Sequence, residues 1–331
     1  MNNIIDLIEC AKNYRKIYIQ THNFPDHDAL GAAFGFQNLL FKFGIDSQII
    51  YGGDITRASL INMVNKFDMR PLEISEVEDS EDEAIIMIDG CRGNKNMKNL
   101  LKARLIGVID HHDTSHIEGI PHIDIRPDYG SCSTIIFTYF EFLGVEISKD
   151  VATALMIGLC VDTAILMRNI VENDVRAYFN LFSKADNVFV QCMVRNYIET
   201  KDLVYYKYAI ENVIIENEIA FCYLKNGCSQ NLLGIMADFF LALEEVTFVM
   251  LCACNEGKIA FSLRSENEEW NAANIIQTLL NGRGFGGGHH NMAGGIMINC
   301  GDNFDERAFF LELKSLLISS STCAAEACHE R

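Results

Sequence analysis

Basic residues are scarce in this chain relative to acidic ones. Its 27 Lys and Arg residues stand against 45 Asp and Glu residues, which gives a formal net charge of −18. Proteins hold long nucleic acids through many Lys and Arg contacts to phosphates. A long nucleic acid is therefore excluded as a partner, whereas a short nucleotide or a small phosphate compound is compatible with this charge. We expect the acidic run over 76–83 to be a solvated loop without a chemical role.

The chain also lacks the patterns that mark zinc-binding, disulfide-rich and membrane proteins. None of its 12 cysteines forms a C-x-x-C pair, and Cys252 and Cys254 alternate within an apolar run as strand residues do. Residues 1–16 lack the basic start and apolar core of a signal peptide, and no apolar stretch reaches the roughly 18–20 residues of a membrane span. These absences predict buried free thiols, no membrane partner and a location in the reducing cytoplasm.

The first half of the chain alternates between strand and helix patterns. Short, nearly all-apolar strands between helices indicate an α/β fold with a parallel sheet and helices on both of its faces. We predict strands over 16–21, 47–52, 83–89 and 103–110, and helices over 4–14, 29–44, 57–67 and 95–101. A longer helical stretch begins at its N-cap Ser131, breaks near Gly144 and ends about residue 182.

The second half begins a new alternation and predicts a smaller α/β domain. It contains a hairpin over 212–225, a helix over 232–243, strands over 246–254, 258–265 and 294–300, and a closing helix over 305–318. Between the halves the apolar period is weak. The expected organisation is a first domain over 1–186, a linker over 187–211, a second domain over 212–320 and a disordered tail over 321–331.

Acidic and histidine residues gather at the points where apolar runs of the first domain end. The set consists of His22, Asp26 and Asp28, then Asp89, then Asp110, His111 and His112, and finally Asp162. Because ligands of open α/β sheets bind at the carboxyl ends of the strands, we expect these side chains to meet at one edge. Neutral imidazole together with carboxylate suits Mn²⁺, Fe²⁺, Co²⁺ or Zn²⁺. The pattern predicts two divalent cations without choosing among these metals, and the ion that we expect is Mn²⁺.

Each of these residues alone also has an ordinary structural interpretation. Asp26 or Asp28 could cap a helix that begins near Ala29, and Asp89 or Asp110 could be a loop residue. Short motifs match by chance, so no single one decides. The delivery of several such residues from separate strands to one edge is what favours the metal interpretation.

A glycine-rich segment in the second domain predicts a clamp for a phosphate group. Consecutive glycines let backbone N–H groups approach phosphate oxygens, and an Arg offers a bidentate fork for the same group. The candidate substrate-binding residues are Gly286, Gly287, Gly288 and His289, with Arg264 and Arg283. The alternative is a flexible turn between a helix and a strand. The match of 282–287 to G-x-G-x-x-G is rejected as a dinucleotide site, because that fingerprint must follow a strand and the preceding residues have helical character.

The order of these motifs resembles a known enzyme superfamily. H-x-x-x-D-x-D over 22–28, a strand-terminal Asp89, D-H-H over 110–112 and D-T over 162–163 are similar to the four motifs of the DHH phosphoesterases. That superfamily includes RecJ-type exonucleases, nanoRNase/pAp phosphatases, cyclic-dinucleotide phosphodiesterases and family II inorganic pyrophosphatases. The segment GFGGGHHNMAGG, with FSLRS before it, resembles the DHH-associated C-terminal domain. The resemblance covers nearly the whole chain.

The resemblance implies a role for each matched residue. One metal would be held by His22, Asp26 and Asp89, and a second by Asp28, Asp89, His111 and Asp162. His112 would face the substrate phosphate. Asp110 would orient the imidazoles through contacts with them, without binding the metals itself. Arg264 and His289 would grip the substrate. Two-metal sites of this kind activate water for attack on phosphorus.

The function expected from this resemblance is a nanoRNase-like phosphodiesterase. Its substrates would be dinucleotides or very short oligoribonucleotides, with cyclic dinucleotides and pAp as further candidates. The sequence D-T-A-I-L over 162–166 departs from the D-T-G and following aromatic of nanoRNases. The alternatives are hydrolysis of pyrophosphate or short polyphosphate, and a dinucleotide sensor without catalysis. Whether the chain forms a homodimer is left open.

Overall fold

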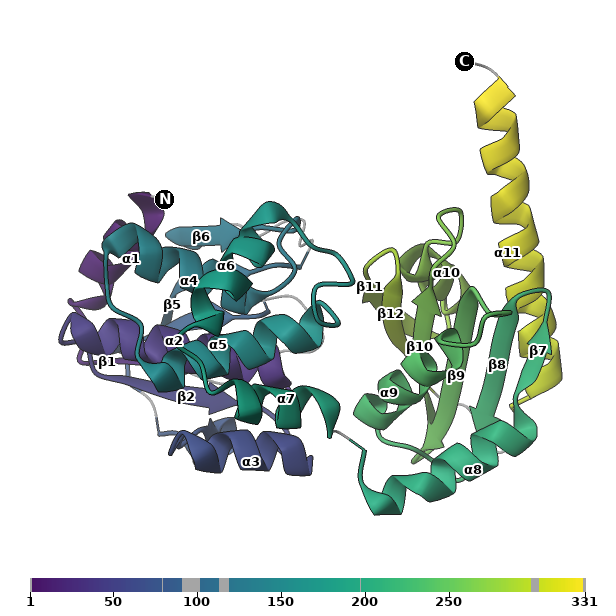
Figure 1. Ribbon diagram of the computed structural model, residues 1–331, viewed down its shortest axis with the longest axis horizontal. Coiled ribbons are helices and arrows are strands. Elements are labelled where there is room, and N and C mark those ends of the chain that lie inside the picture. The colour runs from purple at the N-terminus through teal and green to yellow at the C-terminus, as the bar shows by residue number, and fades with distance from the viewer. Residues whose placement is uncertain are drawn as a thin grey trace. The chain divides into compact units, whose positions relative to one another are not determined.

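The chain folds into two compact units, residues 1–197 and 198–331 (Figure 1). The computed structural model describes residues 2–78, 80–90, 102–112, 119–196, 198–298 and 304–329. The division between the units falls inside the predicted linker over 187–211. That segment is largely helical, and its first helix belongs to the core of the first unit through Val190 and Met193. Its apolar period is weak because the two helices within it bury only two residues each.

The first unit is built on a six-stranded sheet in which every pair of neighbours is parallel. Its strands are β1 (Lys16–Gln20), β2 (Ser47–Tyr51), β3 (Leu72–Glu73), β4 (Glu83–Ile88), β5 (Arg104–Asp110) and β6 (His122–Ile125). The four predicted strands are confirmed. The two strands at the ends of the sheet, β3 and β6, were not predicted, because they are short and none of their residues is fully buried.

Helices of the first unit pack together on one face of this sheet. They are α1 (Asn2–Ala11), α2 (His27–Lys42), α3 (Ala58–Lys66), α4 (Cys132–Leu143), α5 (Lys149–Asp162), α6 (Glu172–Phe182) and α7 (Asn187–Arg195). The short 3₁₀ turn η1 (Ile74–Glu76) packs on the other face through Ile74. Figure 1 shows α2, α4 and α5 side by side, and they share one core with Ile17, Ile19 and Ile86 of the sheet. The other face carries a smaller cluster around Tyr18 and Ile85. The helix predicted over 95–101 lies outside the described residues.

The strand order places a switch point beside β1. The sheet runs β3-β2-β1-β4-β5-β6, so the chain moves to one side after β1 and returns to add β4 on the other. In open α/β sheets ligands bind outside the carboxyl ends of the strands at such a point. The loop after β1 carries the first predicted motif, and Asp89 follows β4 directly. The fold therefore brings these two loops to the edge of the sheet where the metal ligands were expected.

The second unit is a smaller α/β domain with a mixed sheet. Its strands are β7 (Ile214–Glu216), β8 (Ile219–Leu224), β9 (Phe248–Asn255), β10 (Lys258–Ser265), β11 (Gly284–Gly288) and β12 (Met292–Met297). Its helices are α8 (Leu203–Asn212), α9 (Gln230–Leu241), α10 (Ala272–Leu279) and α11 (Glu306–His329), after the 3₁₀ turn η2 (Thr200–Asp202). The order is β11-β12-β10-β9-β8-β7, with only β8 and β9 parallel.

Two features of this unit differ from the sequence-based expectation. The glycine-rich segment is not a loop, because Gly284–Gly288 form the strand β11, which pairs antiparallel with β12. The helix α11 continues to His329, into the segment for which a disordered tail was predicted. That segment contains neither Gly nor Pro, so no residue in it interrupts the helix.

Two predictions, the absence of disulfide bonds and the absence of a membrane span, can be compared with the structure. The described cysteines are free thiols, and most of them are buried. Among the described residues, no helix combines the length and the apolar composition needed to cross a membrane.

Candidate metal centre

Asp26 serves two purposes in the loop between β1 and α2. One oxygen of its carboxylate, Oδ1, accepts hydrogen bonds from the N–H groups of Asp28 and Ala29, both at 3.0 Å, and so caps α2. The other oxygen, Oδ2, lies 3.7 Å from Nε2 of His22. The capping interpretation and the ligand interpretation of Asp26 are therefore compatible, since each uses a different oxygen.

Asp28 is fully buried in the first turn of α2 and faces the start of α4. Its carboxylate accepts hydrogen bonds from the backbone N–H groups of Cys132, at 2.7 Å, and Ser133, at 2.9 Å. Ser131 caps α4 as predicted, by accepting a hydrogen bond from the N–H of Thr134. A helix N-terminus stabilises a nearby carboxylate, and two N–H donors fix its orientation.

Asp89 has the most unusual surroundings of the set. Its backbone has a φ of 60°, a left-handed conformation that is uncommon for a residue with a side chain. Its side chain is 2% exposed, and Oδ1 accepts no hydrogen bond from any residue that the structure describes. A buried carboxylate oxygen without a donor is costly unless a cation compensates it. This oxygen is therefore a fitting ligand for a metal ion.

His111 presents one ring nitrogen to the acidic residues. Its Nδ1 lies 3.1 Å from the carbonyl oxygen of Tyr129, so this nitrogen carries the proton and donates it to the carbonyl. Nε2 then lies 3.5 Å from Oδ1 of Asp89 and 3.3 Å from Oδ2 of Asp162. Fixing of the tautomer by a backbone carbonyl is the usual arrangement for a metal-binding histidine.

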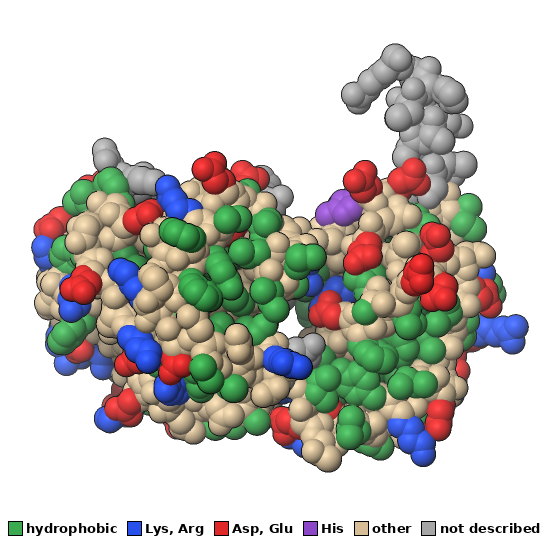
Figure 2. All heavy atoms as spheres, in the orientation of Figure 1, with side chains coloured by type: hydrophobic (Ala, Val, Ile, Leu, Met, Phe, Trp, Pro, Cys, Tyr) green, Lys and Arg blue, Asp and Glu red, His purple; other side chains and the backbone are tan. Residues whose placement is uncertain are grey.

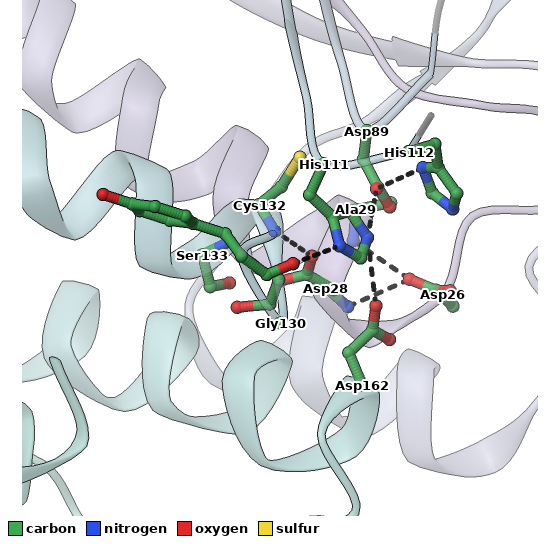
Figure 3. A network of polar contacts seen from close by, with 12 residues as sticks. Asp26, Asp28, Ala29, Asp89, His111, His112, Gly130, Cys132, Ser133 and Asp162 are labelled. Carbon is green, nitrogen blue, oxygen red and sulfur yellow. Dashed lines mark hydrogen bonds and ion pairs between the residues drawn. The ribbon is translucent and has the colours of Figure 1, made fainter. Parts of the chain in front are cut away.

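These side chains form overlapping groups around Asp89, as Figure 3 shows. In each of the groups His22–Asp26–Asp89 and Asp28–His111–Asp162, the candidate ligand atoms lie within 4.8 Å of one another. Asp89 also belongs to a group with His111 and His112 and to another with Asp28 and Cys132. The first group equals the first ligand set implied by the resemblance, and the second contains three of the four residues of the second set, without Asp89. Oδ1 of Asp89 lies 3.5 Å from Nε2 of His111, so its position suits a ligand shared by both cations.

The electrostatics of the cluster show excess buried negative charge. Burial, together with the neighbouring Asp162 and Asp89, raises the pKa of Asp28 well above its usual range. Burial also raises the pKa of Asp162. Burial alone would raise the pKa of Asp89 and lower that of His22. Contacts with the imidazoles instead lower the pKa of Asp89, and contacts with Asp26 and Asp89 raise the pKa of His22 to about 10. Divalent cations would relieve this competition between carboxylates, so the residues fit them.

His112 and Asp110 form a pair at the margin of the cluster. Nδ1 of His112 donates to Oδ1 of the fully buried Asp110 at 2.8 Å, while the imidazole itself is 40% exposed. Burial lowers the pKa of His112, but the contact with Asp110 outweighs this and raises it. Asp110 thus orients His112, whereas His111 is oriented by Tyr129. The expectation that Asp110 orients both imidazoles is wrong for His111, because its Nδ1 faces the carbonyl oxygen.

The guanidinium of Arg264, a predicted substrate contact, is bound within the second unit. It is 7% exposed and faces α9, where Nε lies 2.5 Å from Oδ1 of Asp238. It also donates to the hydroxyl of Ser262 and to the carbonyl of Gly234. An incoming phosphate would reach Arg264 only in exchange for the carboxylate of Asp238. Arg283 is similarly engaged, since it forms a bidentate pair with Glu312 of α11.

The glycines of β11 offer backbone donors at the edge of the second sheet. His289 donates its N–H to the carbonyl of Met292, and Ile298 donates to the carbonyl of Arg283. Alternate residues of an antiparallel pair face the partner strand. The N–H groups of Gly286 and Gly288 consequently point away from β12, as that of Gly284 does. Because β11 is the last strand of its sheet, these donors are directed to the open edge.

Two residues that support the cluster were not predicted from the sequence. Cys132 lies in a potential ligand group with Asp28 and Asp89. Asp174 of α6 is fully buried and accepts hydrogen bonds from the N–H groups of Gly130 and Val171 and from the hydroxyl of Thr134. Asp174 does not follow an apolar run, and it belongs to none of the motifs. The only local signal was its place in the first turn of a helix.

Comparison with known proteins agrees with this arrangement. Residues 16–159 match the model of the DHH family N-terminal domain, and residues 216–312 match that of the DHHA1 domain. An uncharacterized protein of Methanocaldococcus jannaschii is 27% identical over 86% of this chain and 58% of its own length. A probable manganese-dependent inorganic pyrophosphatase of Streptococcus thermophilus is 28% identical over 46% of this chain and 49% of its own length. The chain thus spans about half the length of these curated relatives.

Solved structures share the fold. An exopolyphosphatase-related protein from Bacteroides fragilis superposes with a TM-score of 0.80 at 20% identity, over 97% of this chain and 98% of that one. RecJ from Thermus thermophilus superposes with a TM-score of 0.52 at 15% identity, over 96% of this chain and 52% of that one. With the DHH family N-terminal domain matched over 16–159 and the DHHA1 domain over 216–312, in that order, the chain belongs to the DHH family.

Proposed function

We propose that this chain is a manganese-dependent phosphodiesterase that hydrolyses dinucleotides or very short oligoribonucleotides, as nanoRNases do. The observation that carries the proposal is the pair of ligand groups, His22–Asp26–Asp89 and Asp28–His111–Asp162, joined by the buried carboxylate of Asp89. Two cations held there would supply activated water and offset negative charge on the phosphoryl oxygens. The manganese dependence named for the pyrophosphatase relatives supports Mn²⁺ as the ion.

The residues around the ligand groups support catalysis of phosphoryl chemistry. His112 is held through Nδ1 by Asp110, so its Nε2 is the atom that can hold or donate a proton. An imidazole in this position suits protonation of a leaving oxygen. His22 and His111 carry their Nδ1 protons toward the backbone carbonyls of Asn23 and Tyr129, which keeps each Nε2 directed at the carboxylates.

Short substrates are favoured by the charge and by the second unit. On the face shown in Figure 2, Lys and Arg side chains are scattered among acidic ones and form no continuous basic band. Processive binding of a long single strand requires such a band. The N–H groups at the edge of β11 instead suit a single terminal phosphate.

Pyrophosphate or short polyphosphate is the second candidate substrate, because curated relatives are pyrophosphatases. The structure gives less support for it. Pyrophosphate carries a high charge density and calls for a cationic clamp, yet Arg264 and Arg283 are neutralised by Asp238 and Glu312. The alignment with the pyrophosphatases also leaves more than half of this chain unmatched.

A direct assay separates these functions. The purified chain is incubated with Mn²⁺ and, separately, pApA, pAp, cyclic di-AMP, cyclic di-GMP or pyrophosphate, and products are resolved by chromatography. We expect mononucleotides from pApA and no turnover after removal of Mn²⁺ by a chelator. Turnover of pyrophosphate alone would establish the second candidate. Binding of a dinucleotide without any product would establish a sensor, and full activity in excess chelator would refute a metal-dependent mechanism.

A further inference from the structure

Phe24 is an exposed aromatic residue inside the first metal motif. It lies two residues after His22 and two before Asp26, and 57% of it is exposed. Its backbone has a φ of 55°, in the left-handed region. A residue with a side chain adopts that conformation only where the surroundings enforce it, and such residues cluster at functional sites. Single exposed apolar residues are ordinary. Phe24 shares its exposure and its left-handed backbone with Ile165, and differs from it in being aromatic and in lying between His22 and Asp26.

The loop after β2 holds Phe24 in this position. The N–H of Phe24 donates to the carbonyl of Gly52 at 2.8 Å. Its ring rests against Gly53, where an added Cβ would lie 2.6 Å from Cε1 and 2.7 Å from Cδ1 of the ring. Gly53 itself has a φ of 81°, so a glycine is required there for two reasons. One side of the ring therefore packs against Gly53, and the rest of it is exposed to solvent.

The positions of the loops after β1 and β2 place Phe24 relative to the metal ligands. β2 neighbours β1 on the side opposite β4, and both loops leave the sheet at its carboxyl edge. Phe24 thus lies in the same loop as His22 and Asp26 of the first ligand group, on the β2 side of β1. His111 and Asp162 belong to the other ligand group, and His111 comes from β5, beyond β4. When the phosphate of a substrate lies at the ligand groups, the substrate atoms next to that phosphate could contact Phe24.

We propose that Phe24 is a specificity-determining residue that stacks against a nucleobase of the substrate. The inference rests on the proposed function and deepens it, because it names a base-bearing phosphodiester as the substrate class. Bases of every kind stack on aromatic side chains, so the contact selects nucleotides without selecting a sequence. Pyrophosphate has no apolar surface to cover the ring. Gly52 and Gly53 hold an aromatic side chain beside the metal ligands. A substrate with a nucleobase would explain this arrangement, and an inorganic substrate would not.

The test compares three variants on three substrates. Phe24→Ala removes the ring, Phe24→Trp retains a stacking surface, and Phe41→Ala removes another exposed Phe, 75% exposed, at the far end of α2. The substrates are pApA, its counterpart without bases, and pyrophosphate, all with the Mn²⁺-loaded protein. We expect Phe24→Ala to raise KM for pApA about 10–100-fold, while KM for the counterpart without bases and the kcat values change little. Phe24→Trp should restore KM, and Phe41→Ala should leave it unchanged.

Measurement of bound Mn²⁺ and of the melting temperature completes the experiment. Both should be the same in the wild type and in Phe24→Ala. Equal loss of activity on pApA and on the counterpart without bases, or loss of Mn²⁺, would assign Phe24 a structural role and overturn the inference. Unchanged KM for pApA in Phe24→Ala would overturn the inference alone. If the wild-type chain does not hydrolyse pApA, the proposed function fails, and the inference fails with it.

Discussion

The carboxylate of Asp174 receives a hydrogen bond from the backbone N–H of Gly130 at 3.0 Å. This contact helps to tie α6 to the segment that orients two candidate metal ligands. Just before Gly130, the carbonyl of Tyr129 accepts a hydrogen bond from Nδ1 of His111. Just after it, the N–H groups of Cys132 and Ser133 hold Asp28. His111 and Asp28 belong to the same ligand group, so Asp174 supports one cation position specifically.

Replacement of Asp174 should weaken one of the two cation sites. In Asp174→Ala the N–H groups of Gly130 and Val171 lose their acceptor, which costs stability of about 1–3 kcal/mol for each buried donor left unpaired. Loss of support behind a ligand lowers metal affinity about 10–100-fold. We expect this loss for the group of Asp28, His111 and Asp162 only. Titration with Mn²⁺, followed by calorimetry or electron paramagnetic resonance, should resolve two classes of site.

Asp186→Ala is the matched control for this variant. Asp186 also caps a helix, since it accepts the N–H of Phe189 at the start of α7, but it belongs to none of the ligand groups. It should lose about 1 kcal/mol of stability and retain both affinities. Equal weakening of both cation sites in Asp174→Ala would show a general loss of structure and contradict the assignment.

Replacement of Asp89 should affect both cations at once. Asn at this position keeps the shape of the side chain and removes a charge that belongs to the first ligand group and lies 3.5 Å from His111 of the second. We expect affinity at both sites to fall by more than ~100-fold, because loss of a ligand costs more than loss of a residue behind it. Asp26→Asn should weaken only the group that contains His22. Metal content per chain, measured after equilibrium dialysis, checks both variants. Retention of one tight site in Asp89→Asn would show that Asp89 is not shared.

Much of the metal centre was predictable because its residues follow apolar strands. The runs before Asp89 and His111 mark β4 and β5, and the strand ends of a parallel sheet must meet at one edge. The dual role of Asp26 was open in the sequence, since a cap and a ligand have the same local pattern. The structure shows that the two roles are compatible, because the cap uses Oδ1 while Oδ2 faces His22.

Other features depend on partners that are remote in the chain and leave no local pattern. Arg264 is paired with Asp238, 26 residues away, through a helix-to-sheet contact. Backbone donors such as the N–H of Cys132 cannot be read from side-chain identities at all. Glycines have low strand propensity, so Gly284–Gly288 suggest a loop, and the pairing with β12 overrides that preference.

His112 should contribute to turnover and not to metal binding. Its Nδ1 is engaged by Asp110, and we propose that Nε2 serves the leaving oxygen. Removal of a general acid lowers turnover about 10²–10⁴-fold. His112→Ala should show this loss in kcat with both cations retained, as measured by metal content. His122→Ala, in β6, is the control and should leave kcat unchanged. A normal kcat in His112→Ala would remove the proposed role.

The two neighbouring glycines of β11 should differ in their tolerance of alanine. At Gly287 an added Cβ would meet only Nε2 of Gln277, at 3.9 Å. At Gly288 the φ is 145° and the Cβ would lie 2.4 Å from the carbonyl oxygen of Met292. We expect Gly287→Ala to change the free energy of unfolding by less than about 0.5 kcal/mol and Gly288→Ala to lower it by about 1–3 kcal/mol. Chemical denaturation measures both.

The result bears on function, because the same register directs the N–H groups of Gly286 and Gly288 to the open edge. If Gly288→Ala is as stable as Gly287→Ala, the register of β11 is different and the edge donors cannot serve as the proposed phosphate contact.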